Sequence, residues 1–210
     1  EGVETPILEC LGQTLAGDVY SSFDIPPHDN SAMDGYAVRA KDIAGASAST
    51  PVYLDILGEA RAGLPSNLKV ENHTAVRIMT GAFIPEGADT VVKFEESDET
   101  QRGGQPTKQI GILKPVKKGR NVRYAGEDIS KGHIVMKKGT VLRPAEIGVL
   151  ASLGIEKIKV IRRPVIAILS TGDELVELGQ PLAEGQIYSS NSYSLAAQVL
   201  HYGGIPHILG

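Results

Sequence analysis

The feature that most constrains the fold is the C-terminal stretch, residues 164–210. It holds a continuous apolar run, VIAIL at 165–169, followed by the polar turn STGDE at 170–174. An unbroken apolar run is typical of a parallel strand covered on both faces. A helix over about 192–202 and a second strand, IPHIL at 205–209, are predicted next. We therefore expect one strand-helix-strand unit, with STGDE where α/β sheets bind ligands.

This unit is small for an independent domain. Only 47 residues follow Arg163, because 210 minus 163 is 47. Such a piece lies near the lower limit of independent folding and leaves a parallel strand edge unpaired. The chain also opens on Glu1 rather than on an initiator methionine. We expect a chain that is cut inside a domain and that does not begin at its natural start.

Upstream, short β-branched runs separated by Gly, Pro and Asn predict an all-β region over residues 50–142. The tract 96–109 lacks apolar periodicity and is predicted as the tip of a long exposed hairpin. Residues 11–22 mix helical spacing with glycines, which predicts a short helix running into a strand. Residues 144–154 predict a short buried helix, followed by a strand at 155–161.

Composition excludes several classes of function. The chain has 21 Lys and Arg against 25 Asp and Glu, so it has no overall positive charge of the kind that attracts nucleic acid or anionic membranes, and any polyanion binding would have to be local. No apolar stretch approaches the ~20 residues of a membrane span. Cys10 is the only cysteine, which excludes an internal disulfide and fits a reducing compartment. A cytoplasmic protein without nucleic-acid or membrane partners is predicted.

Common catalytic signatures are missing. The sequence has no Walker A loop, GxGxxG, HExxH or GxSxG motif, and its five histidines are scattered. Instead, dense turns of glycine and carboxylate stand out. Asp29 to Ser31 is predicted to form a hydrogen-bonding turn, and Asp34 with Gly35 to reverse the chain. Thr80 is expected to be exposed beside Gly81. Taken alone, these segments are also compatible with an ordinary β-turn and a hairpin loop.

Two acidic turns could hold Mg²⁺ through one or two oxygens while substrate phosphates complete the octahedron. Glu127 and Asp128 follow Gly126, and their alternative role is a solvated turn paired with Arg120 and Arg123.

The second acidic turn, Asp173 and Glu174, follows the predicted buried strand at its ligand face. The alternative is an Asp that caps a helix.

Together and in this order, five blocks resemble the molybdopterin molybdenumtransferase family, which comprises the bacterial MoeA-type proteins and the E domains of gephyrin and its plant counterparts. The resemblance covers essentially the whole chain, and coincidence over five ordered blocks is improbable. The blocks are PPHDNSAMDGYAVRAKD, AVRIMTGAFIPEGADTVV, GRNVRYAGEDISKG, RPAEIGVLASLGI and VIAILSTGDELVELGQPLAEGQIYSSN.

The resemblance implies a transferase of molybdenum cofactor biosynthesis. Such proteins insert molybdate into adenylylated molybdopterin and release AMP in a step that depends on Mg²⁺ or a similar divalent ion. It also implies a homodimer, with a molybdopterin adenylyltransferase as a candidate partner. The implied fold is mixed and multi-domain: a small α+β central domain (1–20 and 133–162), an inserted β-rich domain (21–132) and an incomplete α/β molybdopterin-binding domain (163–210).

Carried over by position, the family's sensitive residues fall on sites in three of the blocks and in the STGDE turn. The implied catalytic residues are Asp34, Thr80, Asp128, Asp173 and Glu174, of which Asp173 and Glu174 are the implied metal ligands. The first three would approach one cleft, with the partner subunit contributing. The physical expectation agrees, because carboxylates order Mg²⁺ and an attacking water while a Thr hydroxyl holds an oxyanion. The implied pterin-pocket residues are Ser170, Thr171, Gly172 and Asn191.

Two departures from the family pattern matter. Ser189 stands where family members commonly carry Asp, which puts nucleotide contacts there in doubt. The chain also ends before the later acidic and basic segments of the family, so this piece is not expected to catalyse the reaction alone. Two other functions stay open: a partner-binding scaffold of the gephyrin type, and an unrelated Mg²⁺-dependent phosphoanhydride hydrolase.

Overall fold

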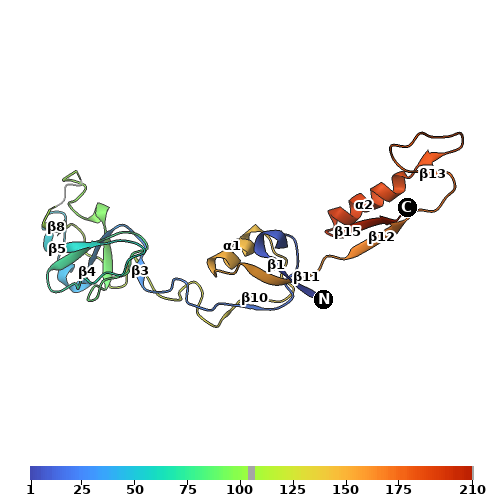
Figure 1. Ribbon diagram of the computed structural model, residues 1–210. Helices are drawn as coiled ribbons and strands as arrows, with labels where there is room; N and C mark the ends of the chain where they lie inside the picture. The colour runs from blue at the N-terminus through green and yellow to red at the C-terminus, as the bar shows by residue number, and fades with distance from the viewer. Residues whose placement is uncertain (104–106, 210) are drawn as a thin grey trace. The chain divides into compact units, whose positions relative to one another are not determined.

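The computed structural model describes residues 1–103 and 107–209, and the described chain is mainly β with two α-helices (Figure 1). It divides into two compact units, residues 1–20 with 134–210, and residues 21–133. Gly104 and Pro106, which belong to the predicted hairpin tip, lie outside the described residues. No helix in the described ranges has the length and apolar character needed to cross a membrane. The expected β-rich character of the chain is confirmed, because most of the described elements are strands.

In the first unit, strand β1 (Gly2–Pro6) pairs antiparallel with β11 (Lys157–Ile161). A 3₁₀ turn at Ile7–Cys10 follows β1, and β2 (Val19–Tyr20) pairs antiparallel with β10 (Ile134–Met136). The helix predicted within residues 11–22 is therefore wrong. Gly12 has a positive φ of 78°, and the chain beyond it forms isolated bridges to neighbouring strands, so the backbone there is extended.

Helix α1 (Pro144–Ser152) confirms the helix predicted over 144–154. Pro144 occupies the first turn, where its missing N–H has no helical partner to lose. The Glu146 carboxylate accepts a hydrogen bond from the Arg143 backbone N–H at 3.0 Å, which completes a capping box. Leu150 is buried, and Gly154 ends the helix at a φ of +70°.

The C-terminal residues form the predicted strand-helix-strand unit. β12 (Val165–Leu169) pairs parallel with β15 (Ile205–Leu209), and α2 (Ser190–His201) packs along both strands (Figure 1). The helix begins two residues earlier than predicted. In β12 only Ile168 is buried, so the expected cover on both faces is not present among the described residues.

A short pair of parallel strands follows the STGDE turn. β13 (Leu175–Val176) pairs in register with β14 (Ile187–Tyr188). The loop between them is closed by a hydrogen bond from the Tyr188 hydroxyl to the Gln180 carbonyl at 2.9 Å. Because a strand and not a helix begins at Leu175, the helix-capping alternative for Asp173 is wrong.

The second unit is built on a five-stranded sheet in the order β7-β4-β6-β5-β8. Only β5 and β6 run parallel, and the other neighbours are antiparallel. Short 3₁₀ turns at Ala40–Ile43 and Phe94–Glu96 follow β4 and β7. The strands are β4 (Gly35–Val38), β5 (Val52–Ala60), β6 (Thr74–Ile78), β7 (Thr90–Lys93) and β8 (Gln109–Ile112).

Both faces of this sheet are buried. Tyr36 and Val38 of β4 contribute to one apolar cluster, and Ala37 from the same strand contributes to the other. Every residue of β4 is buried, because successive side chains of a strand point to opposite faces and both faces are covered here. Strand β4 is thus held by apolar packing on both of its faces.

The strand order overturns one local expectation and places another in a new context. β6 and β7 are separated by β4, so the segment with Thr80 is not a hairpin loop. The tract after β7 does fold back, since Ser97 forms an antiparallel bridge with Ile112 and Asp98 N–H donates to the Gly111 carbonyl at 2.9 Å. The described part of tract 96–109 is therefore a hairpin-like excursion, but it connects strands at opposite edges of the sheet.

The predicted turn at Asp29 to Ser31 is also corrected. Asn30–Ser31 form strand β3, which pairs antiparallel with β9 (Val122–Arg123). The Asp29 carboxylate accepts a hydrogen bond from the Ala125 backbone N–H at 2.8 Å, across 96 residues of sequence. Asp29 therefore stabilises a contact between distant segments rather than a local turn.

Candidate functional site

Asp34 and Thr80 meet at one end of the five-stranded sheet. Asp34 directly precedes β4 and Thr80 follows β6, and Gly35 lies opposite Ile78 in the register of these strands. The Thr80 backbone N–H donates to Asp34 Oδ1 at 2.7 Å, and the Thr80 hydroxyl donates to the same oxygen at 2.8 Å. Two residues that the sequence separates by 46 positions thus form a direct pair.

Thr80 keeps the Asp34 carboxyl ionised. The pKa of Asp34 is lowered, first by the Thr80 backbone N–H and then by the Thr80 hydroxyl, and the charge of Arg77 adds to this effect. Both Thr80 donors end on Oδ1. The Thr80 hydroxyl was expected to hold an oxyanion, but its proton is committed to Asp34. The contact observed for Thr80 is thus with a carboxylate of the same unit.

A charged cluster lies on the sheet face beside this pair. Arg77 of β6 donates to Glu99 at 3.1 Å, lies 3.6 Å from Glu59, and stacks over the Phe94 ring with its guanidinium carbon 4.6 Å from the ring centre. The Tyr36 hydroxyl donates to the other Glu99 oxygen at 2.6 Å. Neither Arg77 nor Glu99 was predicted from the sequence as a residue of this site. The only available signal was the position of Arg77 three residues before Thr80.

The cluster makes Tyr36→Phe a test of how this face is held. Burial, followed by the Glu99 carboxylate, raises the pKa of Tyr36, so the phenol stays a proton donor. Removing the hydroxyl leaves Glu99 with one donor fewer, and we expect the second unit to lose about 1 to 2 kcal/mol of unfolding free energy. The loss should be fully present below pH 10 and shrink above it, because the phenol then ionises in the unfolded chain while burial and Glu99 still keep it protonated in the folded one. Urea unfolding measures it.

Tyr53→Phe is the matched control for that experiment. Tyr53 lies on β5 of the same sheet and is 55% exposed. Loss of an exposed hydroxyl is expected to change the unfolding free energy by less than about 0.5 kcal/mol. Equal effects of the two substitutions would contradict a stabilising bond between Tyr36 and Glu99.

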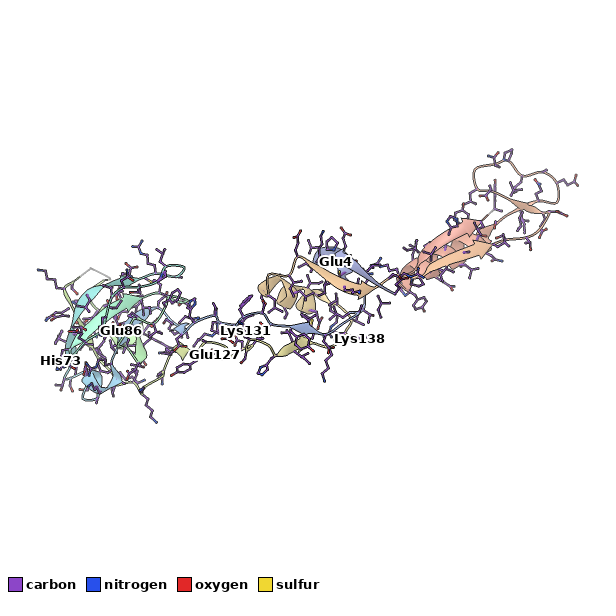
Figure 2. The ribbon with its side chains drawn as sticks, turned by 60° about the horizontal axis from the view of Figure 1, so that its bottom comes forward. Glu4, His73, Glu86, Glu127, Lys131 and Lys138 are labelled. Carbon is purple, nitrogen blue, oxygen red and sulfur yellow. The ribbon has the colours of Figure 1, made fainter. Side chains whose placement is uncertain are left out.

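The GEDI turn is paired with an arginine. Arg123 donates to Glu127 at 2.8 Å and also bonds to Asp128. The Arg123 side chain is the first cause of the lowered pKa of Glu127, and the Tyr124 backbone N–H is the second. Figure 2 labels Glu127 in this turn. The geometry is that of the solvated, arginine-paired turn, with Arg123 rather than Arg120 as the partner.

Segment 30–34 connects the two parts of the second unit that carry predicted site residues. On one side, Gly81 N–H donates to the Ser31 carbonyl at 2.8 Å. On the other, Ala32 N–H donates to the Asn121 carbonyl at 2.9 Å, and Asn30 pairs with Arg123. The Asp34–Thr80 pair and the Asp128 turn therefore flank one short segment. The structure brings Asp34 and Thr80 into contact, but shows no bond between either of them and Asp128.

The STGDE turn borders a pocket of about 320 Å³ in the first unit. Ser170 and Gly172 line it, whereas Thr171 and Asn191 are exposed and are not among the lining residues. The complete lining set is Ser170, Gly172, Leu175, Val176, Glu177, Ser189, Ser192, Tyr193, Ile208 and Leu209. Two of the four predicted pterin-binding residues therefore face the cavity.

Asp173 and Glu174 lie exposed after β12. A Cβ atom at Gly172 would lie 2.6 Å from a Glu174 carboxylate oxygen, so glycine makes room for this side chain. Across residues 1–103 and 107–209, no three His, Cys, Asp or Glu side chains gather closely enough to form a metal centre of their own. Two neighbouring carboxylates still match the sparse protein ligation of Mg²⁺, which leaves the other positions to waters and substrate phosphates.

Comparison with known proteins shows which protein family this chain matches. Residues 1–154 match the family model described as MoeA N-terminal region (domain I and II). Among curated proteins, a molybdopterin molybdenumtransferase 2 of Mycobacterium tuberculosis is 40% identical over 96% of this chain and 48% of its own length. A molybdopterin molybdenumtransferase of Nostoc is 43% identical over 95% of this chain and 44% of its own length. The chain thus spans about half the length of these relatives.

A solved structure agrees. The crystal structure of the molybdopterin biosynthesis MoeA protein from Pyrococcus horikoshii is 36% identical, with a TM-score of 0.89, and covers 100% of this chain and 54% of that one. The match extends over the strands that carry Asp34, Thr80 and the STGDE turn. On sequence and fold together, the chain belongs to the MoeA N-terminal region family.

Proposed function

We propose that the natural protein containing this chain acts in molybdenum cofactor biosynthesis. It would insert molybdate into adenylylated molybdopterin and release AMP in a Mg²⁺-dependent step. The observation that carries this proposal is the contact of Asp34 with Thr80, since the resemblance assigns both positions to the site independently of that contact. Curated relatives at 40% and 43% identity that are named molybdopterin molybdenumtransferase support it.

The pocket beside STGDE would take the pterin ring. Its volume of about 320 Å³ suits a small heterocycle, and Leu175, Val176 and Ile208 supply apolar walls. The lining holds one charged side chain, Glu177, and it is acidic. An anionic phosphate or molybdate would be repelled there, so the proposal places the uncharged ring in this pocket and the anionic groups outside it.

Asp173 and Glu174 would hold Mg²⁺ at the mouth of the same region. When bound, the ion would neutralise charge on the phosphoanhydride. Asp34 would accept a proton from a water whose oxygen forms a new bond to the molybdopterin phosphorus, while the bridging P–O bond of the phosphoanhydride breaks and AMP leaves. Thr80 would hold Asp34 ionised and correctly turned, and Arg123 would fix the Asp128 turn.

The natural protein would be a homodimer in the cytoplasm, with a molybdopterin adenylyltransferase as candidate partner. Its proposed domains are a central domain, an inserted β-rich domain and a molybdopterin-binding domain beginning near residue 163. The whole natural protein, rather than this 210-residue piece alone, would catalyse the reaction.

A molybdenum-insertion assay on the natural protein tests the function. We expect Asp173→Asn and Glu174→Gln each to raise the Mg²⁺ concentration needed for half-maximal AMP release by about tenfold or more. Glu184→Gln, an exposed carboxylate in the loop between β13 and β14, is the matched control and should leave it unchanged. Absence of molybdenum insertion by the wild type, together with hydrolysis of simple nucleotides without pterin, would replace the proposal with a phosphoanhydride hydrolase.

A further inference from the structure

Three serine hydroxyls meet on the floor of the STGDE pocket. Ser170 directly follows β12, Ser189 precedes α2, and Ser192 lies in the first turn of α2. Ser189 Oγ is 2.7 Å from Ser192 Oγ and 3.2 Å from Ser170 Oγ, and Ser170 is also hydrogen-bonded to Ser192. We call this set the serine ring, because each hydroxyl contacts both others.

The hydroxyl protons of the serine ring are used in hydrogen bonds within the ring. A serine hydroxyl has one proton to donate and two lone pairs to accept with. Ser189 donates to Ser170. If Ser170 donates to Ser192 and Ser192 to Ser189, all three contacts are hydrogen bonds and no proton is left over. Each oxygen then keeps one lone pair. A closed ring of this kind presents acceptors, not donors, to a molecule in the pocket.

Burial decides which members a ligand can reach. Ser192 is 3% exposed, whereas Ser170 and Ser189 are half-buried on the pocket floor. The ligand would therefore meet mainly the lone pairs of Ser170 and Ser189. Ser192 also lines the pocket but is almost fully buried, and its hydrogen bonds to both other serines would fix the direction of their protons.

We propose that the serine ring recognises an N–H donor edge of the ligand, and that Ser192 is the positioning residue that makes it an acceptor surface. This inference rests on the proposed function, which places a pterin ring in the pocket. A pterin has such an edge in its amino group and the neighbouring ring N–H. A carbonyl oxygen at the same edge would face lone pairs and be disfavoured.

The test compares two free rings on the natural protein. Pterin carries a 2-amino group and an unprotonated N1, whereas lumazine carries a 2-oxo group and an N1–H, and the two bicyclic rings share the N3–H and the 4-oxo group. By calorimetry, we expect the wild type to bind pterin about tenfold more tightly than lumazine, because one group donates to the serine ring and the other is opposed by it. Equal affinities for the two rings would overturn the inference.

Ser192→Ala separates positioning from packing. Without Ser192 the proton of Ser170 is released and can donate to the ligand, so lumazine should gain affinity and the pterin-to-lumazine ratio should fall toward one. Ser194→Ala, an exposed serine of the same helix, is the matched control and should keep the wild-type ratio. Thermal unfolding of both variants checks that the fold is retained.

The outcomes distinguish the inference from the proposed function. A Ser192→Ala variant that is folded and keeps the wild-type ratio would overturn the positioning role and leave the proposed function standing. Failure of the wild type to bind either ring would count against both. Loss of the ratio in Ser192→Ala but not in Ser194→Ala supports the serine ring as the feature that selects the ligand edge.

Discussion

Gly35→Ala should destabilise the second unit by about 3 kcal/mol or more, because the added methyl group has no room. A Cβ atom at this position would lie 1.9 Å from the Val92 carbonyl oxygen and 3.0 Å from the Lys93 Cα. Both contacts are backbone of the neighbouring strand β7, which cannot rotate away as a side chain would. β4 and β7 would have to separate, and their paired residues from Gly35–Lys93 to Val38–Thr90 would lose register.

Hydrogen exchange gives the clearest measurement of this effect, since two compact units need not unfold together. In Gly35→Ala, the amides of β4 and β7 should exchange faster while those of β1 and β11 in the first unit keep wild-type rates. The matched control is Gly45→Ala, where the new Cβ atom meets no heavy atom within 4 Å. Slow exchange in β4 of Gly35→Ala would contradict a backbone contact at this distance.

The same contact explains why the structural role of Gly35 was predicted wrongly from the sequence. Asp-Gly is a strong turn signal, so the pattern predicted a chain reversal. The glycine is needed instead because two strands approach closely, and that requirement comes from β7, more than 50 residues away in sequence. A local pattern cannot show which glycine serves a turn and which serves a close approach. This error hardly affects the predicted position of Asp34, because Asp34 still lies at the end of a strand.

Locally encoded elements were predicted well. VIAIL and IPHIL were recognised from their apolar runs, and the helix after Arg143 from its proline, acidic first turn and terminal glycine. The failures concern partners distant in sequence. The order β7-β4-β6-β5-β8 places no two consecutive strands of the chain side by side except β5 and β6, which is why the hairpin loop expected at Thr80 is absent.

The candidate site shows the same division. The resemblance assigned Asp34 and Thr80, and no spacing argument could have shown that Thr80 donates both of its protons to Asp34. The pairing of Asp128 was left open between metal ligation and an arginine turn, and the Arg123 contacts correspond to the second. The serine ring was not predicted, because Ser170 and Ser192 are brought together by the β12–α2 packing.

Asp34→Asn should lower the rate of molybdenum insertion by about a hundredfold in the natural protein, the lower end of the range for loss of a general base. The amide keeps a carbonyl oxygen in the place of Oδ1, so the Thr80 N–H and hydroxyl can still donate to it. What disappears is the negative charge and the ability to accept a proton. An Asn variant that folds normally and retains wild-type turnover would refute Asp34 as the proton acceptor.

Thr80→Ala addresses the same carboxylate through its pKa, and its effect has a definite sign. The Thr80 donors lower the pKa of Asp34, so the wild-type carboxylate stays ionised to lower pH. Alanine removes the hydroxyl but keeps the backbone N–H. The pKa of Asp34 should then rise toward its usual value, and the acid limb of the rate profile should move to higher pH while turnover near pH 7 is largely kept. Thr80→Ser retains the hydroxyl and should retain the wild-type limb. A uniform loss of rate across the pH range in Thr80→Ala, with no movement of the limb, would instead mean that Thr80 acts on the substrate and not on Asp34.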